Sequence, residues 1–179
     1  MSGFEGSHDA MGCVQRTVKR LFDIVFSLAG MIILSPVYLV IAIMLKRQKN
    51  GPAIFSQERI GYRGKPFTIY KFRTMSEPEK EPQLVAKSSI GQSTKTELFL
   101  REHHLDELPQ LWNVLKGDMS IIGPRPDLDS EMALYQGDEG RKLEVTPGIT
   151  GYAQAYGRNS LPWHDRLALD VYYVDHLSF

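Results

Sequence analysis

The longest apolar run of the chain lies near its N-terminus, from Leu21 to Leu45, and Asp23 is its only charged residue. As one straight helix this run would measure roughly 37 Å, enough to cross a hydrocarbon core of about 30 Å. It is too long for the apolar core of a signal peptide, and no cleavage site of small residues follows it. A membrane-spanning anchor is therefore the first interpretation.

Two features of this run favour a different path. Three basic residues lie within residues 16–20 and three within residues 46–49, and basic flanks prefer the cytoplasmic side. Ser35-Pro36 interrupts the run, and proline costs about 3 kcal/mol inside a helix, whereas a serine hydroxyl can satisfy a carbonyl that the break frees. We therefore favour a re-entrant membrane helix that bends at Ser35-Pro36 and returns to the same face, with a span as the alternative.

The rest of the chain shows shorter patterns. Two short strands are predicted at residues 53–57 and 67–71, with a polar loop over residues 77–92. Helical patterns are predicted at residues 94–102, at 106–116 with Gly117 as a stop, at 127–135 and at 160–176. The sequence thus predicts an α+β fold that is mostly helical.

Aromatic residues indicate where amphipathic helices meet a membrane surface. Trp163, Leu167, Val171 and Val174 lie near one face of the last predicted helix, and Trp and Tyr favour the membrane–water interface. Ordinary core packing is the alternative for each of these side chains. We divide the chain into a disordered or vector-derived tail (1–15), a helix–break–helix (16–50) and a small cytoplasmic catalytic domain (51–179).

Composition narrows the class of protein. The chain has 179 residues, with 21 basic and 21 acidic side chains, which suits about one domain and argues against a nucleic-acid partner. Cys13 is the only cysteine, so an internal disulfide is excluded. The mean hydropathy of −0.24 excludes a polytopic membrane protein but allows one membrane segment.

The richest stretch for chemistry is residues 101–126. Asp106 and Glu107 stand side by side before a predicted helix, where they would be good capping residues. The same position offers free N–H groups that favour phosphate, and a carboxylate there can act as a nucleophile or metal ligand. Arg101, one turn upstream, and Arg125, fixed between two prolines, could clamp phosphate oxygens. Asp118 adds a further acid.

Other motifs carry less. The chain has neither a P-loop nor a G-x-G-x-x-G pattern, and His103-His104 has poor spacing for a metal. Asp127 and Asp129 form an Asp-x-Asp pattern, which is common by chance and here opens a predicted helix.

A series of ordered motifs resembles the bacterial sugar transferase family, the monotopic phosphoglycosyl transferases, in its minimal catalytic form. The motifs are KRLFD at 19–23, SP at 35–36, FSQERIG at 55–61, YKFRTM at 70–75, LDELPQLWNVLKGDMS at 105–120, IGPRP at 122–126, PGITG at 147–151 and GRN at 157–159. Their number and order make the resemblance far more specific than any single motif.

The resemblance implies an enzyme on the cytoplasmic face of the bacterial inner membrane. Such enzymes move a sugar-1-phosphate from a UDP-sugar to a polyprenol phosphate (undecaprenyl phosphate) and release UMP. Asp106 matches their nucleophile, which forms an aspartyl phosphosugar with Mg²⁺ at this carboxylate. Glu107 matches a second acid whose role is less settled.

The resemblance also names phosphate-binding candidates. Arg101 and Arg125 match phosphate-contacting arginines. Lys71, Arg73 and Arg158 lie in family motifs and are further candidates, although Lys71 and Arg73 have no firm role. The implied partners are the two substrates and membrane lipids, and a homodimer is left open. No residue identifies the sugar or the downstream glycan.

Two other hypotheses compete with this one. A metal-dependent glycosyltransferase would release UDP and use Asp127 and Asp129, so Asp127→Asn rather than Asp106→Asn would abolish its activity. In a non-catalytic membrane scaffold, Asp106 and Glu107 would only cap a helix, and Asp106→Ala would cost about 1 kcal/mol of stability.

Overall fold

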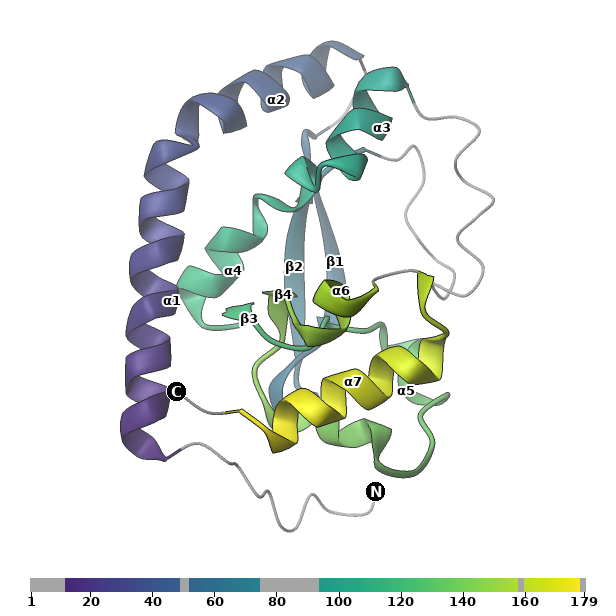
Figure 1. Cartoon of the computed structure of the whole chain (residues 1–179). Helices are drawn as coiled ribbons and strands as arrows, with labels where there is room; N and C mark the ends of the chain where they lie inside the picture. Colours follow the sequence, from purple (N-terminus) through teal and green to yellow (C-terminus); the bar gives the residue numbers. More distant parts are fainter. Residues whose placement is uncertain (1–11, 49–51, 75–93, 158–159, 178–179) are drawn as a thin grey trace.

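The structure, a computed structural model, describes residues 12–48, 52–74, 94–157 and 160–177 (Figure 1). Its helices are α1 (Cys13–Ile33), α2 (Ser35–Gln48), α3 (Lys95–Glu102), α4 (Gln110–Lys116), α5 (Asp129–Met132), α6 (Tyr152–Tyr156) and α7 (Trp163–Asp175). The 3-10 segments are η1 (Tyr62–Gly64), η3 (Leu105–Glu107) and η4 (Gly137–Glu144). The strands are β1 (Ile54–Ile60), β2 (Pro66–Phe72), β3 (Ser120–Ile122) and β4 (Gly148–Thr150). The predicted mostly helical fold with short strands is confirmed.

The N-terminal apolar run forms two helices that meet at an angle of 60°. Pro36 has no N–H to donate to the Ile32 carbonyl, and the Ser35 hydroxyl donates to that carbonyl instead, at 2.8 Å. The predicted break and its serine partner are therefore confirmed. No single helix in the described part is long and apolar enough to cross a membrane, whereas α1 and α2 together meet that criterion of length and composition.

This bent pair covers one side and one end of the molecule (Figure 1). Its buried face is small and includes Asp23, Ser27, Ile41 and Leu45. Its outer face is apolar and exposed on both helices, over Val14, Val18, Leu21, Phe22, Val25, Phe26, Leu28, Ile32, Ile33, Val37, Leu39, Val40, Ile43 and Met44. A contiguous apolar surface of this extent marks an interaction face rather than ordinary solvent-exposed surface.

The start of α1 corrects the predicted tail. The Gly12 N–H donates to the Gln15 side chain at 3.0 Å, and the helix begins at Cys13. Residues 13–15, which were predicted to be part of the tail, are therefore helical. Residues 1–11 and the predicted polar loop at 77–92 lie outside the described residues.

Strands β1 and β2 form an antiparallel hairpin in which Phe55 faces Lys71 and Ile60 faces Pro66. The turn contains Arg63 and Gly64, both with positive φ. Strand β1 runs three residues beyond its predicted end, because the charged Glu58-Arg59 pair does not stop it. Arg59 is buried and its guanidinium donates to Gln57 at 2.8 Å.

Strands β3 and β4 form a second, parallel pair that the sequence did not predict. Gly123 and Gly148 pack backbone to backbone at its end, and a Cβ on Gly148 would lie 2.1 Å from the Gly123 nitrogen. The Gly123 N–H donates to Thr150 and the Gly148 N–H donates to Pro124, both at 2.8 Å. This close approach fixes the backbone immediately before residue 125.

The helix predictions divide into confirmed and corrected ones. Thr94 caps α3, since its hydroxyl accepts from the Glu97 N–H and its own N–H donates to the Glu97 carboxylate, at 3.3 and 2.8 Å. Gly117 ends α4 with a φ of 100°. The helix predicted at 127–135 shrinks to Asp129–Met132, because the Asp127 carbonyl accepts from the Ile60 N–H. The last helix begins at Trp163 rather than at residue 160.

Two apolar clusters connect these elements. One joins α2 to β2 and α3 through Ile41, Leu45, Phe72 and Leu100. The other joins β2 and α4 to the residue before β3 through Ile69, Val114 and Met119. Strand β2 therefore packs against α3 and α4, the two helices that flank the segment carrying Asp106 and Glu107.

Candidate active site

Asp106 and Glu107 lie in the 3-10 segment η3, between α3 and α4. His104 adopts a left-handed conformation that turns the chain before them. The Glu107 N–H donates to the His104 carbonyl at 3.2 Å, and Pro109 has no N–H to donate one turn back to Leu105. The turn therefore tightens instead of continuing as an α-helix.

This geometry corrects the predicted role of the helix start. Residues 106–116 were predicted to be one helix with Asp106 at its N-cap, but α4 begins at Gln110 with Pro109 as its cap residue. The two acids thus lie outside the short α4, and its dipole does not account for a phosphate site. The positive charge at this site comes instead from side chains on other elements.

Glu107 is the fixed member of the acidic pair. Its side chain is buried, and Oε1 accepts from Arg125 Nη2 at 2.9 Å and from Lys71 Nζ at 3.3 Å. Burial by itself raises the pKa of Glu107, but the charges and hydrogen bonds of Arg125 and Lys71 outweigh it and lower the pKa to about 2. Glu107 is therefore ionised throughout the physiological range.

Asp106 is the more accessible member of the pair. It is half-buried, and none of the ion pairs within the described ranges includes it. Burial and the neighbouring Glu107 charge raise its pKa, while Lys71 acts in the opposite direction. Two adjacent carboxylates whose environments push their pKa values apart are typical of residues with different chemical roles. Asp106 is the more basic and the more accessible of the two.

Lys71 and Arg125 reach this pair from separate elements. Lys71 lies near the end of β2, and burial followed by the Arg125 charge lowers its pKa. Arg125 follows β3 in the Pro-Arg-Pro turn, whose backbone is fixed by the Gly148 N–H bond to Pro124. The structure thus brings together Asp106, Glu107, Lys71 and Arg125, and it places Lys71, which has no firm role in the sequence analysis, beside Glu107.

The remaining phosphate-binding candidates are not joined to this group. Arg101 lies in α3, and one of its guanidinium nitrogens is buried without a hydrogen-bond partner in the described part of the chain. Arg73 follows β2, where its N–H donates to Ala53 at 2.8 Å. Neither arginine forms an ion pair with Asp106 or Glu107 within the described ranges. Arg158 lies outside the described residues.

The acids of the competing glycosyltransferase hypothesis have other partners. Asp127 is buried and accepts from Lys142 Nζ and from the Tyr135 hydroxyl, both at 2.7 Å. Asp129 is exposed at the first residue of α5, and Asp118 pairs with Lys116 at 2.7 Å. A sealed carboxylate that already shares an ammonium is poorly placed to bind a metal, so the structure opposes the Asp-x-Asp metal site.

The donor set at η3 fits a magnesium ion better. In the residues that the structure describes, no three His, Cys, Asp or Glu side chains gather into a metal cage. Mg²⁺ does not require such a cage, because it is commonly held by one or two carboxylates together with substrate phosphates and water. Asp106, half-buried and outside every described ion pair, has the chemistry of such a ligand.

The basic residues at the start of α1 have a function that the sequence did not indicate. Arg20 donates to the carbonyls of Val114 and Leu115, at 2.6 and 2.8 Å. Asp23 accepts from the Ser120 hydroxyl at 3.0 Å, and Lys19 donates to the same hydroxyl. Lys19 and Arg20, whose charge the sequence analysis uses to predict topology, thus also bind α1, together with Asp23, to the end of α4 and the start of β3.

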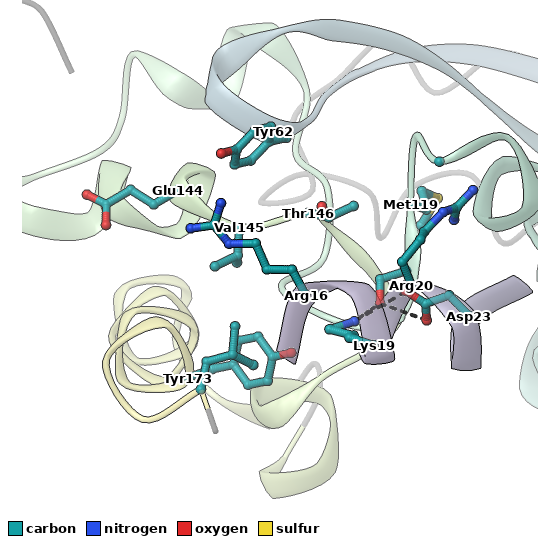
Figure 2. Close-up of a pocket in the computed structure, with 13 residues that line it drawn as sticks. Arg16, Lys19, Arg20, Asp23, Tyr62, Met119, Glu144, Val145, Thr146 and Tyr173 are labelled. Atoms are coloured by element: carbon teal, nitrogen blue, oxygen red, sulfur yellow. Dashed lines mark hydrogen bonds and ion pairs between the residues drawn. The ribbon is translucent and has the colours of Figure 1, made fainter. Parts of the chain in front are cut away.

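A cavity of about 290 Å³ lies at this junction (Figure 2). It opens between α1, α7 and the segment before β4, and Arg16, Tyr62 and Tyr173 are among its lining residues. None of Asp106, Glu107, Lys71 and Arg125 lines it. Because Lys19 and Arg20 are already bonded to protein groups, the cavity is part of the anchoring junction of α1.

The chain is similar in sequence to known proteins of one family. A family model described as bacterial sugar transferase matches residues 14–179. The chain is 43% identical over 162 residues to an uncharacterized sugar transferase, EpsL, of Bacillus subtilis (strain 168), which covers 90% of this chain and 80% of the relative.

Two longer relatives have more specific names. The chain is 39% identical over 175 residues to an undecaprenyl-phosphate galactose phosphotransferase of Salmonella typhimurium (strain LT2), covering 89% of this chain and 37% of that protein. It is 44% identical over 148 residues to a UDP-glucose:undecaprenyl-phosphate glucose-1-phosphate transferase of Klebsiella pneumoniae. This match covers 80% of this chain and 32% of that protein. The motifs and the family match agree, and the chain is an enzyme of the bacterial sugar transferase family.

Proposed function

We propose that this enzyme transfers a sugar-1-phosphate from a UDP-sugar to a polyprenol phosphate and releases UMP, as the first membrane step of bacterial glycan assembly. The names of the Salmonella and Klebsiella relatives support this reaction class. The chain spans about a third of the length of these two relatives, so the substrates are carried over to it as part of the proposal.

The observation that carries the proposal is the contrast between the two adjacent acids. Glu107 is held by two cations, whereas Asp106 is half-buried, takes part in no ion pair of the described residues and has a raised pKa. In its ionised form, a more basic carboxylate is the better nucleophile. These properties suit covalent catalysis by Asp106.

The proposed reaction has two balanced steps. An oxygen of Asp106 attacks the β-phosphorus of the UDP-sugar, an Asp106–phosphorus bond forms, and the bond to the UMP oxygen breaks. A phosphate oxygen of the polyprenol phosphate then attacks the same phosphorus and returns the carboxylate of Asp106. When bound, Mg²⁺ would offset the charge of the diphosphate, with Asp106 as its proposed protein ligand.

Lys71 and Arg125 have a positioning and electrostatic role in this scheme. They place two positive charges beside two carboxylates, so the group is close to neutral before an anionic diphosphate arrives. The planar guanidinium of Arg125 is suited to phosphate oxygens, and the Pro-Arg-Pro backbone limits its movement. Glu107 keeps both cations within reach of Asp106.

The bent helix pair is proposed to enter the inner membrane from the cytoplasmic face and return to it. Its exposed apolar face and the 60° break support insertion without a span. The Tyr38 hydroxyl of α2 donates to the Leu108 carbonyl, next to Glu107. The pair is thus joined directly to the catalytic turn, which suits an acceptor that arrives from the lipid phase.

The test is to incubate the detergent-solubilised enzyme with UDP-sugars and Mg²⁺, without acceptor, and to measure UMP and UDP separately. About one UMP per enzyme in the native protein, and none in Asp106→Asn, is expected. Release of UDP would overturn the covalent scheme in favour of glycosyl transfer. Sidedness is tested by labelling single cysteines at residues 15 and 50, and labels on opposite faces would show a span.

A further inference from the structure

A second ionic cluster is sealed between η4, α7 and the segment after Arg125. Lys142 Nζ lies 2.7 Å from an oxygen of Asp127 and 2.9 Å from an oxygen of Asp170. All three side chains are no more than 4% exposed, and the Tyr135 hydroxyl donates to Asp127 as well. None of these groups has a role in the reaction proposed above.

Asp127 connects this cluster to Arg125. It stands two residues after Arg125, with Pro126 between them, and its backbone carbonyl accepts from the Ile60 N–H at 2.9 Å. On the other side of Arg125, the Pro124 carbonyl accepts from the Gly148 N–H at 2.8 Å. The backbone of Arg125 is therefore held at both ends, and at one end the hold includes a buried side chain.

Stability alone does not explain such a cluster. Removing two carboxylates and an ammonium from water costs several kcal/mol per ion by order of magnitude, and well-packed apolar residues often do as well or better. One Asp170 oxygen is also buried without a hydrogen-bond partner in the described part of the chain. The cluster instead fixes the orientation of Asp127. The Lys142 ammonium, shared with Asp170, and the Tyr135 hydroxyl both donate to the Asp127 carboxylate.

We propose that Lys142, acting through Asp127, is a positioning residue that holds Arg125 against Glu107. The chain of contacts runs from Lys142 to Asp127 at 2.7 Å, along the backbone through Pro126, and from Arg125 to Glu107 at 2.9 Å. Its effect on turnover rests on the proposed function, whereas its effect on the loop does not. The Asp-x-Asp pattern thus serves the reaction indirectly.

A double-mutant cycle tests the proposal. Misplacing a catalytic group by about 1 Å can cost roughly 10²-fold, so Lys142→Met is expected to lower kcat/KM for the UDP-sugar by roughly 10- to 100-fold. In an Arg125→Ala background the same change is expected to cost less than about 3-fold, because the residue through which Lys142 acts is already absent. An equal loss in both backgrounds would overturn the proposal.

Two further variants separate positioning from general damage. Glu97→Gln removes another fully buried carboxylate, which caps α3, and its effect on kcat/KM is expected to be the same in both backgrounds. Asp127→Asn keeps the side-chain volume and repeats the cycle if Lys142→Met does not fold. It is expected to show the same loss of effect in Arg125→Ala, and equal losses would again overturn the proposal.

Amide hydrogen exchange gives a readout that does not depend on activity. The Ile60 N–H bonds to Asp127, whereas the Tyr70 N–H bonds to Asn113 at 3.1 Å and serves as the internal control. In Lys142→Met the Ile60 exchange rate is expected to rise at least tenfold relative to the Tyr70 rate, because a general loss of stability speeds both amides. An unchanged ratio of the two rates would overturn the proposal. Full activity of Arg125→Ala with a faster Ile60 rate would instead contradict the role of Arg125 in the proposed function.

Discussion

Two clusters meet within residues 125–127, and each consists of oppositely charged side chains. They differ in how accessible their carboxylates are. Around Arg125, the carboxylate of Glu107 is ion-paired, while Asp106 stays half-buried and belongs to no described ion pair. Around Asp127, the carboxylates share Lys142 and are almost fully buried. Both clusters contain two acids, and the sequence analysis offers one acid of each, Asp106 and Asp127, as catalytic in competing hypotheses. The comparison teaches that an acid is available for chemistry where its carboxylate stays accessible and outside the neighbouring ion pairs.

The largest expected effect separates the two acids that the sequence offered as alternatives. Asp106→Asn should reduce UMP formation roughly 10³-fold or more, because it removes the proposed nucleophile. Asp127→Asn should slow the reaction but leave the UMP burst at about one per enzyme. Quench-flow measurement of burst amplitude and rate checks both. A full burst in Asp106→Asn would break the comparison.

For stability, the Lys142 cluster is expected to matter more than Asp106, which reverses the order expected for activity. Lys142→Met leaves two buried carboxylates without their ammonium and should lower the free energy of unfolding by about 3–5 kcal/mol. Asp106→Asn should change it by less than about 1 kcal/mol, since Asp106 has no described ion pair to lose. Denaturant unfolding of both variants in the same detergent measures the difference. Equal losses would contradict the assignment of a structural role to one cluster and a chemical role to the other.

Acid should weaken the Arg125 cluster through Glu107. The folded-state pKa of Glu107 is about 2, below its ordinary value of 4.5, so its stabilising contribution is complete above about pH 4.5 and is lost as the pH falls toward 2. Over that window the stability advantage of the native protein over Glu107→Gln should shrink by about 3 kcal/mol. Unfolding measurements at stepped pH without Mg²⁺ test this, and a constant difference would contradict it.

The smallest effect is expected at Asp129, the exposed partner in the Asp-x-Asp pattern. Asp129→Asn should change the free energy of unfolding by no more than about 0.5 kcal/mol and turnover by less than about 2-fold. It is a control for Asp127→Asn, because it removes the same charge two residues away. A strong loss of activity with UDP as product would revive the metal-dependent alternative.

Local chemistry explains which parts of the fold the sequence predicted. The break at Ser35-Pro36 and the Gly117 stop each depend on a single residue and its neighbours, and both are confirmed. The parallel pairing of β3 with β4 depends on the contact of Gly123 with Gly148, and three-residue strands give no periodic signal. The sequence does not show that the backbone at Gly123 approaches the backbone at Gly148, so this strand pairing was not predicted.

The sequence predicted most residues of the site but not the interactions that hold them together. The sequence singled out Asp106, Glu107 and Arg125, and the structure places Glu107 between Arg125 and Lys71, with Asp106 beside it. The sequence analysis attributes part of the positive charge beside these acids to the start of a helix. The helix does not begin there, because Pro109 tightens the turn and α4 starts at Gln110. Lys71 lacked a role because only the folded hairpin brings it to Glu107.

The central claim is that Asp106 forms the covalent intermediate. The most direct measurement is mass spectrometry of the protein after incubation with a UDP-sugar and Mg²⁺ and no lipid acceptor, followed by fragmentation of the peptide that contains residues 102–116. The account predicts the added mass of one sugar phosphate on Asp106, which disappears when polyprenol phosphate is supplied. An adduct on Glu107, or UMP released in step with lipid product and no adduct at all, would contradict it.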